Sequence, residues 1–262
     1  MNSDSLAGLT VLITRPSTQQ QTLQRAIEEK GGAVLSLPLI EITPLTEPIA
    51  RQELKDKVLG LDNYQALIFV SSNAVKFGGE LINDYWPQFP LGIDVIAVGP
   101  TTAEATRKLL ACEVIQPSSG MTSEDILRLP QLQDVKEKKI GIVRGRGGRE
   151  LLATTLKERG ALVDYLEAYS RKVISYDNKD FCDRVKAAGV KVLTVNSGES
   201  LDRLISLLAD NKEIIEQLVL LVPSERVALQ AKNAGFSKIK NAKGADPVSF
   251  VLALGELGAD RE

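Results

Sequence analysis

Short apolar runs alternate with amphipathic stretches along the chain, and residues 139–172 show the pattern most clearly. Ile140, Ile142 and Val143 form an apolar run bounded by glycine, which is typical of a buried parallel strand. An arginine- and glycine-rich turn follows at residues 144–149. Glycines at a strand-to-helix turn let backbone N–H groups approach an anion, so this turn is a candidate anion site.

The segment after this turn predicts a helix and then a second strand. The positions that share one helical face are Leu151, Leu152, Thr155, Leu156 and Arg159. Gly160 supplies the residue that ends the helix, and an extended stretch runs from Leu162 to about Lys172.

The N-terminal segment follows the same plan. A strand at residues 11–13 leads to Arg15, a helix runs from Gln21 to Lys30, and a strand starts after Gly32. Both segments continue into long extended runs, residues 38–44 and 166–172. The similar order of polar turns in the two halves indicates an internal duplication.

Polar turns follow the other predicted strands as well. These strands cover residues 64–70, 94–98, 190–195 and 218–222, with a short strand at 114–115. A helix is expected from Ala74, and Thr122 and Ser123 open another with capping chemistry. Ligands of such sheets sit beyond the carboxyl ends of the strands. The candidate binding residues at these ends are Arg15, Ser71, Ser72, Asn73, Gly99, Thr101, Thr102, Thr122, Ser123, Arg144, Gly145, Ser197, Gly198 and Ser224.

The alternation of strands and helices predicts an α/β fold with parallel sheets. Each half supplies about four strands, too few for one large covered sheet, so we expect two domains with a ligand cleft between them. The pattern alone allows two contiguous halves or two interleaved domains.

Composition narrows the classes of function. The 262 residues carry a net charge of −2, which gives no electrostatic argument for nucleic acid or an acidic membrane. No apolar run is long enough to span a bilayer, and residues 1–8 lack the features of a signal peptide. Cys112 and Cys182 are isolated, so we expect reduced thiols, no zinc site and a cytoplasmic protein.

The chain contains no histidine. This excludes Ser-His-Asp triads, Cys-His dyads and the commonest general base. Any catalysis has to use carboxylates, Lys, Tyr, hydroxyls, backbone dipoles or the reactivity of the substrate itself.

Taken together, the motifs resemble the uroporphyrinogen-III synthase family over nearly the whole chain. The matching stretches are residues 12–16 (LITRP), 38–42 (PLIEI), 68–75 (IFVSSNAV), 97–103 (AVGPTTA), 122–124 (TSE), 144–151 (RGRGGREL) and 169–171 (YSR). Where family members often carry a second Gly-x-Thr turn, this chain has Val222, Pro223, Ser224 and Glu225.

The resemblance implies two flavodoxin-like parallel-sheet domains joined by a two-stranded β-ladder. Residues 1–37 with 173–262 would form one domain, residues 45–163 the other, and residues 38–44 and 164–172 the linker strands. It also implies a monomer without cofactor or metal, and it allows transient contact with hydroxymethylbilane synthase.

By the same resemblance, the chain is expected to cyclise hydroxymethylbilane to uroporphyrinogen III, with inversion of ring D and loss of water, in haem biosynthesis. The substrate carries eight carboxylates, which helix N-termini and hydroxyls can bind without a net basic charge. Tyr169 is the candidate proton donor for the departing hydroxyl, because a phenol can donate at neutral pH.

Structural roles compete with each of these assignments. The serines and threonines are typical helix caps, the arginines are able to form ion pairs, Gly145 suits a tight turn, and Tyr169 suits packing. One alternative function is a two-domain cytoplasmic protein that binds an anionic small molecule without catalysis. A sugar- or nucleotide-binding module is less consistent, because the chain has no Gly-x-Gly-x-x-Gly turn and no phosphate-loop lysine.

Overall fold

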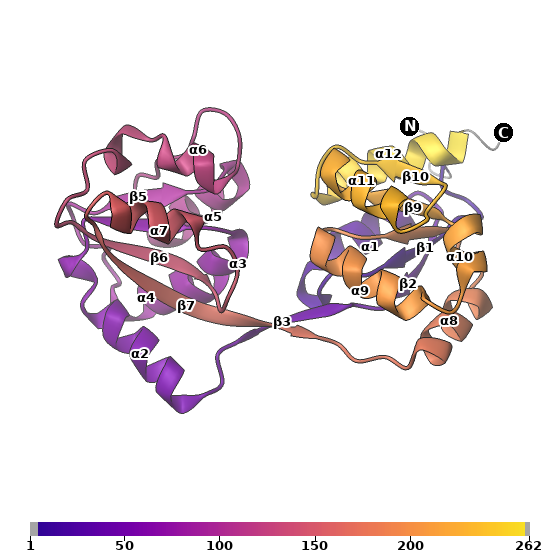
Figure 1. Cartoon of the computed structure of the whole chain (residues 1–262), viewed down its shortest axis with the longest axis horizontal. Helices are drawn as coiled ribbons and strands as arrows, with labels where there is room; N and C mark the ends of the chain where they lie inside the picture. The colour runs from indigo at the N-terminus through magenta and orange to yellow at the C-terminus, as the bar shows by residue number, and fades with distance from the viewer. Residues whose placement is uncertain (1–4, 260–262) are drawn as a thin grey trace. The chain divides into compact units, whose positions relative to one another are not determined.

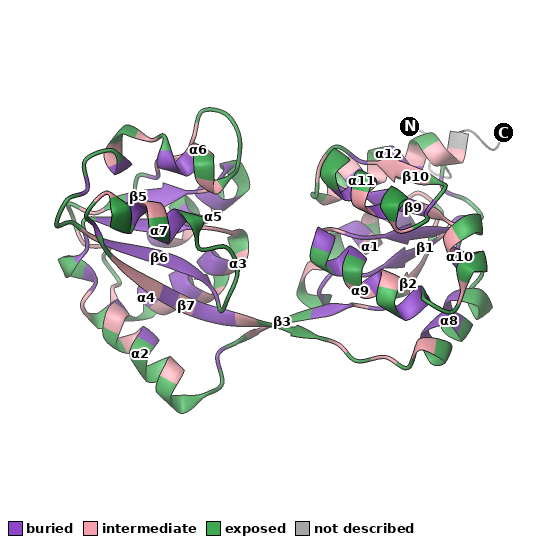
Figure 2. Cartoon of the chain, viewed as in Figure 1, coloured by how far each residue is buried: buried purple, intermediate pink, exposed green. Residues whose placement is uncertain are grey.

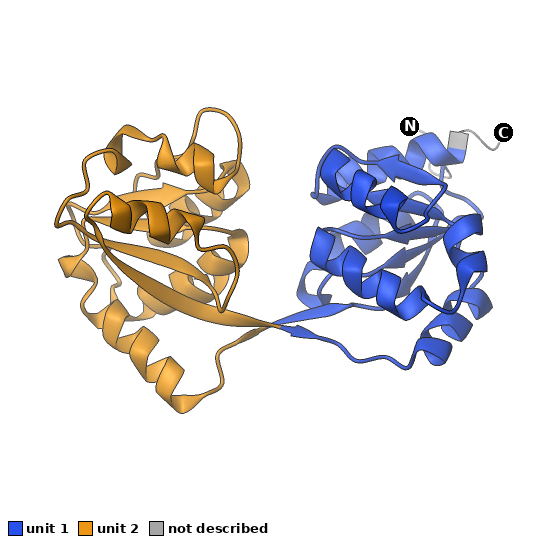
Figure 3. Cartoon of the chain, in the orientation of Figure 1, with its two compact units in different colours: residues 1–42, 172–262 blue, residues 43–171 orange. Residues whose placement is uncertain are grey.

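In the computed structural model, residues 5–259 are described, and they divide into two compact units (Figure 3). Unit 1 comprises residues 1–42 and 172–262, and unit 2 comprises residues 43–171. Residues 1–4 and 260–262, which the sequence assigns to the ends of the first domain, lie outside the described part. None of the helices described is long and apolar enough to cross a membrane.

Unit 1 contains a five-stranded parallel sheet in the order β10-β9-β8-β1-β2 (Figure 1). Its strands are β1 (Thr10–Ile13), β2 (Ala33–Ser36), β8 (Val192–Thr194), β9 (Val219–Val222) and β10 (Ile239–Asn241). Its helices are α1 (Gln21–Glu28), α8 (Asn178–Ala187), α9 (Gly198–Leu208), α10 (Lys212–Gln217), α11 (Glu225–Asn233) and α12 (Pro247–Ala259).

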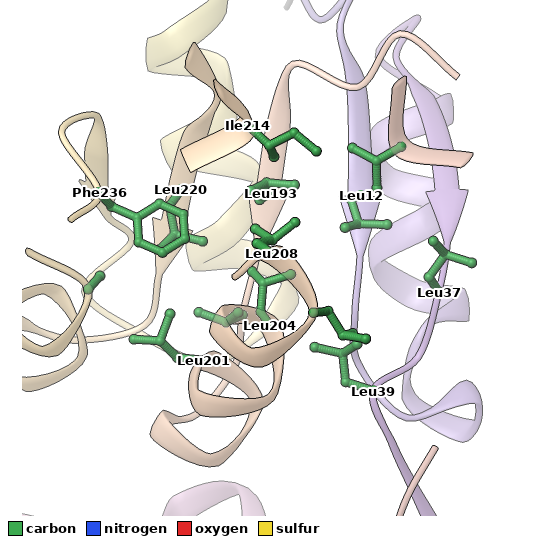
Figure 4. Packing of buried hydrophobic residues seen from close by; sticks show 14 of the residues in the cluster. Leu12, Leu37, Leu39, Leu193, Leu201, Leu204, Leu208, Ile214, Leu220 and Phe236 are labelled. Atoms are coloured by element: carbon green, nitrogen blue, oxygen red, sulfur yellow. The ribbon is translucent and has the colours of Figure 1, made fainter. Parts of the chain in front are cut away.

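Helices cover both faces of this sheet, so side chains on both sides of each central strand are buried (Figure 2). In β1, Leu12 belongs to the same apolar cluster as Leu193, Leu204 and Leu220, on the face covered by α8, α9 and α11 (Figure 4). Val11 and Ile13 face the opposite cluster, which α1 and α12 complete. This alternation explains why β1 is apolar at every position from Val11 to Ile13.

Unit 2 contains a second five-stranded sheet, in the order β3-β7-β6-β4-β5. Its strands are β3 (Ile40–Pro44), β4 (Ala66–Phe69), β5 (Asp94–Ala97), β6 (Lys139–Gly145) and β7 (Leu162–Val173), and the four from β4 to β7 pair in parallel. Its helices are α2 (Pro48–Leu59), α3 (Ser72–Ala74), α4 (Glu80–Tyr85), α5 (Pro100–Leu110), α6 (Ser123–Leu127) and α7 (Leu151–Glu158). The boundary between the units falls within β3 and near the end of β7.

Three expectations about local structure are wrong, and a fourth concerns the helix expected from Ala74. Each sheet has five strands, where about four were expected for each half. Residues 114–115 form only one bridge, from Ile115 to Ile96. On α7 the buried stripe is Leu152, Ala153 and Leu156, and Leu151 is exposed.

The helix expected from Ala74 is interrupted by a π-helical segment, Val75–Gly79. A Cβ atom on Gly78 would lie 2.3 Å from Val143 Cγ1, on a central strand of the sheet. A Cβ on Gly79 would instead meet the flexible end of Leu109, 2.9 Å away. The segment therefore lies against the sheet at a distance that only glycine permits at position 78.

We predict that Gly78→Ala lowers the free energy of unfolding by about 1–3 kcal/mol, because the added methyl overpacks a buried contact. Gly79→Ala is the matched control, because it gains the same helix propensity but meets a side chain that can move. Urea unfolding followed by circular dichroism measures both. Equal stability of the two variants would contradict this packing.

Candidate functional site

Each sheet has one position where the chain connections leave in opposite directions, and the candidate residues cluster there. In unit 1 the connection from β1 leads to β2, whereas that from β8 leads to β9 on the other side. In unit 2 the same divergence occurs between β4 and β6. Open α/β sheets bind ligands at such points, beyond the carboxyl ends of the strands. Arg15 and Ser197 follow β1 and β8, and Ser71 and Gly145 mark the ends of β4 and β6.

Arg15 is a buried cation with unused hydrogen-bond donors. Its exposed fraction is 5%, and its Nε and Nη2 atoms find no hydrogen-bond partner among residues 5–259. The guanidinium lies 4.5 Å from the ring centroid of Phe250 in the first turn of α12. Burial lowers the pKa of Arg15, and the nearby Asp246 carboxylate opposes that shift. A buried guanidinium with free donors is costly unless an anion binds it.

The other unit 1 candidates open helices. The Ser197 hydroxyl accepts from the Ser200 backbone N–H at 3.2 Å, in a reciprocal capping box at the start of α9. Gly198 is buried beneath Gln230 of α11. Ser224 precedes α11 without a side-chain cap bond. The structure therefore gives Ser197 a capping role and leaves the Ser224 hydroxyl outside the cap.

In unit 2, Tyr169 of β7 meets Ser71, which follows the end of β4. Their hydroxyl oxygens are 3.1 Å apart, and Ser71 Oγ also accepts from the Ala74 backbone N–H. Tyr169 is fully buried, and its ring centroid lies 5.6 Å from that of Phe77. The phenol is thus fixed in position by a strand end on one side and the π-helical segment on the other.

An irregularity in β7 places this tyrosine. Arg144 of β6 lies opposite Glu167, but the next residue, Gly145, lies opposite Tyr169, so Ala168 is an extra residue in β7. Such bulges redirect side chains beside functional sites. A Cβ on Gly145 would stand 2.5 Å from Tyr169 Cε2. Gly145 is therefore needed for the ring to lie across the end of β6.

The glycine-rich turn, residues 144–149, is stabilised by hydrogen bonds from the Arg144 side chain to its own backbone carbonyls. Arg144 Nε donates to the Gly145 carbonyl at 3.1 Å and Nη1 to the Arg149 carbonyl at 3.2 Å, and Nη2 donates to the Gly147 carbonyl. The backbone N–H of Arg146 donates to the Tyr169 carbonyl at 2.8 Å. The sequence predicted that backbone N–H groups of this turn would bind an anion. At least one of them, that of Arg146, donates to a protein carbonyl instead.

A cavity of about 210 Å³ lies beside this turn and is rich in positive charge. Arg144, Arg149 and Arg171 line it, together with Tyr165 and Tyr169, and no Asp or Glu is among its lining residues, all of which lie in the described chain. Ser123 also lines the cavity. Its size and charge suit one carboxylate-bearing group rather than a large molecule.

The remaining unit 2 candidates lie outside this cavity lining. Thr122 caps α6 through a reciprocal box with Asp125. Gly99 precedes α5 and is packed against Met121, Thr101 is exposed, and Thr102 is buried in the first turn. Ser72 is exposed and Asn73 half-buried, both within the short helix α3. These residues share the carboxyl edge of the sheet with the cavity.

Four residues of this region were not among the candidate site residues, although two of them, Arg149 and Arg171, lie in the family-matching stretches; the other two are Tyr165 and Phe77. Arg171 lies two residues after Tyr169 in β7, with its guanidinium 5.9 Å from the tyrosine ring centroid. The two-residue spacing along a strand was the available signal, because alternate side chains share a face. Arg144 lies 4.7 Å from the ring centroid of Tyr165. Phe77 had no local signal, because only the π-helical segment brings it to Tyr169.

Comparison with known proteins gives a consistent family. Residues 21–251 match the family model described as uroporphyrinogen-III synthase HemD. The chain is 34% identical over 251 residues to uroporphyrinogen-III synthase of Escherichia coli (strain K12), covering 94% of this chain and 100% of that protein. It is 36% identical over 198 residues to that of Proteus mirabilis, covering 76% of this chain and 98% of the other.

Solved structures agree in fold. A mutant uroporphyrinogen III synthase from the extremely thermophilic bacterium Thermus thermophilus aligns with a TM-score of 0.63 at 15% identity, covering 97% of this chain and all of the other. The uroporphyrinogen-III synthetase from Helicobacter pylori 26695 aligns with a TM-score of 0.55 at 17% identity, covering 97% and 99% of the two chains. These likenesses support the parallel α/β fold.

We predict that Arg15→Met keeps or raises the free energy of unfolding, by about 1 kcal/mol. The reason is that an apolar chain of similar length replaces a buried charge whose Nε and Nη2 atoms have no hydrogen-bond partner among residues 5–259. Arg159→Met is the contrasting variant, because the Arg159 guanidinium donates to the Leu127 and Leu132 carbonyls and its loss should destabilise the protein. Urea unfolding without ligand measures both. A large loss of stability for Arg15→Met would show that Arg15 has a structural role instead.

Proposed function

This chain belongs to the uroporphyrinogen-III synthase family, and we propose that it closes hydroxymethylbilane into uroporphyrinogen III with inversion of the last ring. The observation that carries this proposal is the cavity where a fixed phenol, Tyr169, shares the lining with three arginines and no carboxylate. A substrate with eight carboxylates needs such donors, and a leaving hydroxyl needs a proton.

The proposed reaction begins with loss of the terminal hydroxyl of the substrate as water, which leaves an electrophilic azafulvene. The substituted carbon of the last ring attacks it and forms a spiro intermediate. That intermediate fragments and recloses with the last ring inverted. Closure without the enzyme gives the uninverted isomer, so the main task of the protein is to hold the substrate in the geometry of spiro attack.

We assign the residues to two kinds of work. Arg15 in unit 1, and Arg144, Arg149 and Arg171 in unit 2, would bind substrate carboxylates, with helix N-termini adding neutral donors. Tyr169 would donate to the departing hydroxyl, with Ser71 holding the phenol oxygen 3.1 Å away. Because Tyr169 is fully buried, the departing group would have to enter the cavity to reach it.

We also propose that the two units are flavodoxin-like domains joined by a two-stranded linker. Renumbered within unit 1, the strand order reads 2-1-3-4-5, which supports a flavodoxin-like domain. The unit boundary falls within β3 and near the end of β7, two neighbouring strands, which supports a two-stranded linker. We further propose a cytoplasmic monomer without cofactor, and sedimentation of the purified chain tests the oligomeric state.

The function is tested by incubating the chain with hydroxymethylbilane generated in situ by its synthase, then separating the oxidised porphyrin isomers by chromatography. We expect the type III isomer to dominate. Release of the type I isomer alone, at the uncatalysed rate, would contradict catalysis. If the chain nevertheless bound the product, that result would favour the alternative of an anion-binding protein without catalysis.

We predict that Tyr169→Phe lowers the single-turnover rate by about ten- to a hundredfold, at or below the low end of general acid catalysis, because the pyrrole nitrogen already activates the leaving hydroxyl. Product affinity should change little, since the ring remains. An acid role leaves the type III isomer dominant, whereas a positioning role raises the share of the type I isomer.

Tyr176→Phe is the control, because it also removes a phenol hydrogen bond, to the Pro38 carbonyl, but lies outside the cavity. It should keep the wild-type rate and isomer ratio. If Tyr169→Phe did the same, Tyr169 would be a packing residue only.

A further inference from the structure

A second and larger cavity in unit 2 lies away from the residues assigned above. Its volume is about 500 Å³, within the range of small-molecule sites. It is formed by the end of β3, by α2, by the π-helical segment and by α4, and it shares no lining residue with the arginine-lined cavity. The two cavities are neighbours, because the Phe77 ring lines the larger cavity and packs against Tyr169, and Ala168, which also lines it, precedes Tyr169 in β7.

The walls of this cavity are apolar and aromatic. The side chains that supply this surface are Leu45, Leu54, Phe77, Leu81 and Tyr85. Leu45 and Leu54 are buried, whereas Phe77 and Leu81 are half-buried and Tyr85 is 39% exposed. Such walls favour a ligand with a flat apolar body, which is able to pack against the two aromatic rings.

The rim of the cavity is positively charged. Arg51 and Lys55 lie four residues apart, on one face of α2. Among residues 5–259, Arg51 has no side-chain hydrogen bond or ion pair, and the contact of Lys55 is with the Tyr85 ring, 5.3 Å from its centroid. No Asp or Glu lines the cavity, all of which is described. The charge pattern therefore selects an anionic head group.

We propose that this cavity is a binding site for a small amphipathic anion, with a planar one- or two-ring apolar body and one or two acidic groups. The rings would pack between Leu81, Phe77 and Tyr85, and the acidic group would lie at Arg51 and Lys55. The proposal is independent of the tetrapyrrole reaction, because it uses none of the residues assigned to that substrate.

The probe for this site is 8-anilinonaphthalene-1-sulfonate, and N-phenyl-1-naphthylamine provides the same rings without the charge. Fluorescence titration of the full chain gives a Kd for each dye. We expect the sulfonate dye to bind at one saturable site and more tightly than the neutral dye. Its affinity should fall with added salt, because exposed charges are screened. Equal affinity of the two dyes would overturn the proposal.

The double variant Arg51→Gln, Lys55→Gln tests the charged rim. We expect it to weaken the sulfonate dye about tenfold, the combined effect of two partly exposed ionic contacts, while the neutral dye changes less than twofold. The control is Lys108→Gln, Lys157→Gln, which removes the same charge from exposed helical positions in the same unit outside this cavity. An equal loss in the control would show a general charge effect and overturn the proposal.

A third variant tests the apolar wall. Tyr85→Ala removes one aromatic wall at a partly exposed position, so the fold should tolerate it, and we expect both dyes to weaken by a similar factor of about five. Emission from Trp86, the single tryptophan of the chain and the neighbour of Tyr85, should be quenched as the sulfonate dye binds. Unchanged affinities for both dyes in Tyr85→Ala would place the dyes elsewhere and contradict the site.

Discussion

The structure depends on one constraint, that a parallel strand buried on both faces ends where a helix must begin. The first N–H groups of that helix have no partner inside it, so every such junction directs donors and capping side chains to one edge of the sheet. In unit 1 this edge holds Arg15 and Ser197, and in unit 2 it holds Ser71, Gly145 and Tyr169. The candidate site follows from this edge, and the sequence of each turn decides what it binds.

Local charge matters more here than net charge. The net charge of −2 suggested that neutral backbone donors would bind the substrate carboxylates. The structure instead collects Arg144, Arg149 and Arg171 around one cavity and uses part of the backbone donors of the glycine-rich turn internally. Arg15 keeps buried donors unused among the described residues. The proposed binding therefore combines a few charged contacts, which exclude apolar or cationic ligands, with the neutral donors of helix N-termini.

The sequence correctly predicted the features that depend on a local pattern of apolar and polar residues. Apolar runs such as Ile140, Ile142 and Val143 identified β6, and the parallel α/β class is confirmed by the structure and by its likeness to solved structures. The site residues were chosen from strand ends, and most are found at the carboxyl edges. The features that the sequence did not predict depend on contacts between residues far apart in the chain. The bulge at Ala168 and the π-helical segment that brings Phe77 to Tyr169 arise from sheet register and from Gly78 packing on Val143, which no local periodicity encodes.

The central claim is that turns at the carboxyl edges of both sheets bind the substrate. Amide hydrogen exchange with and without uroporphyrinogen III, followed by mass spectrometry under anaerobic conditions, tests it most directly. The account predicts slower exchange in peptides that cover the turns after β4 and β6 in unit 2 and after β1 and β8 in unit 1, with little change in α8 or α10. Protection confined to helical surfaces away from these edges, or to one unit alone, would contradict it.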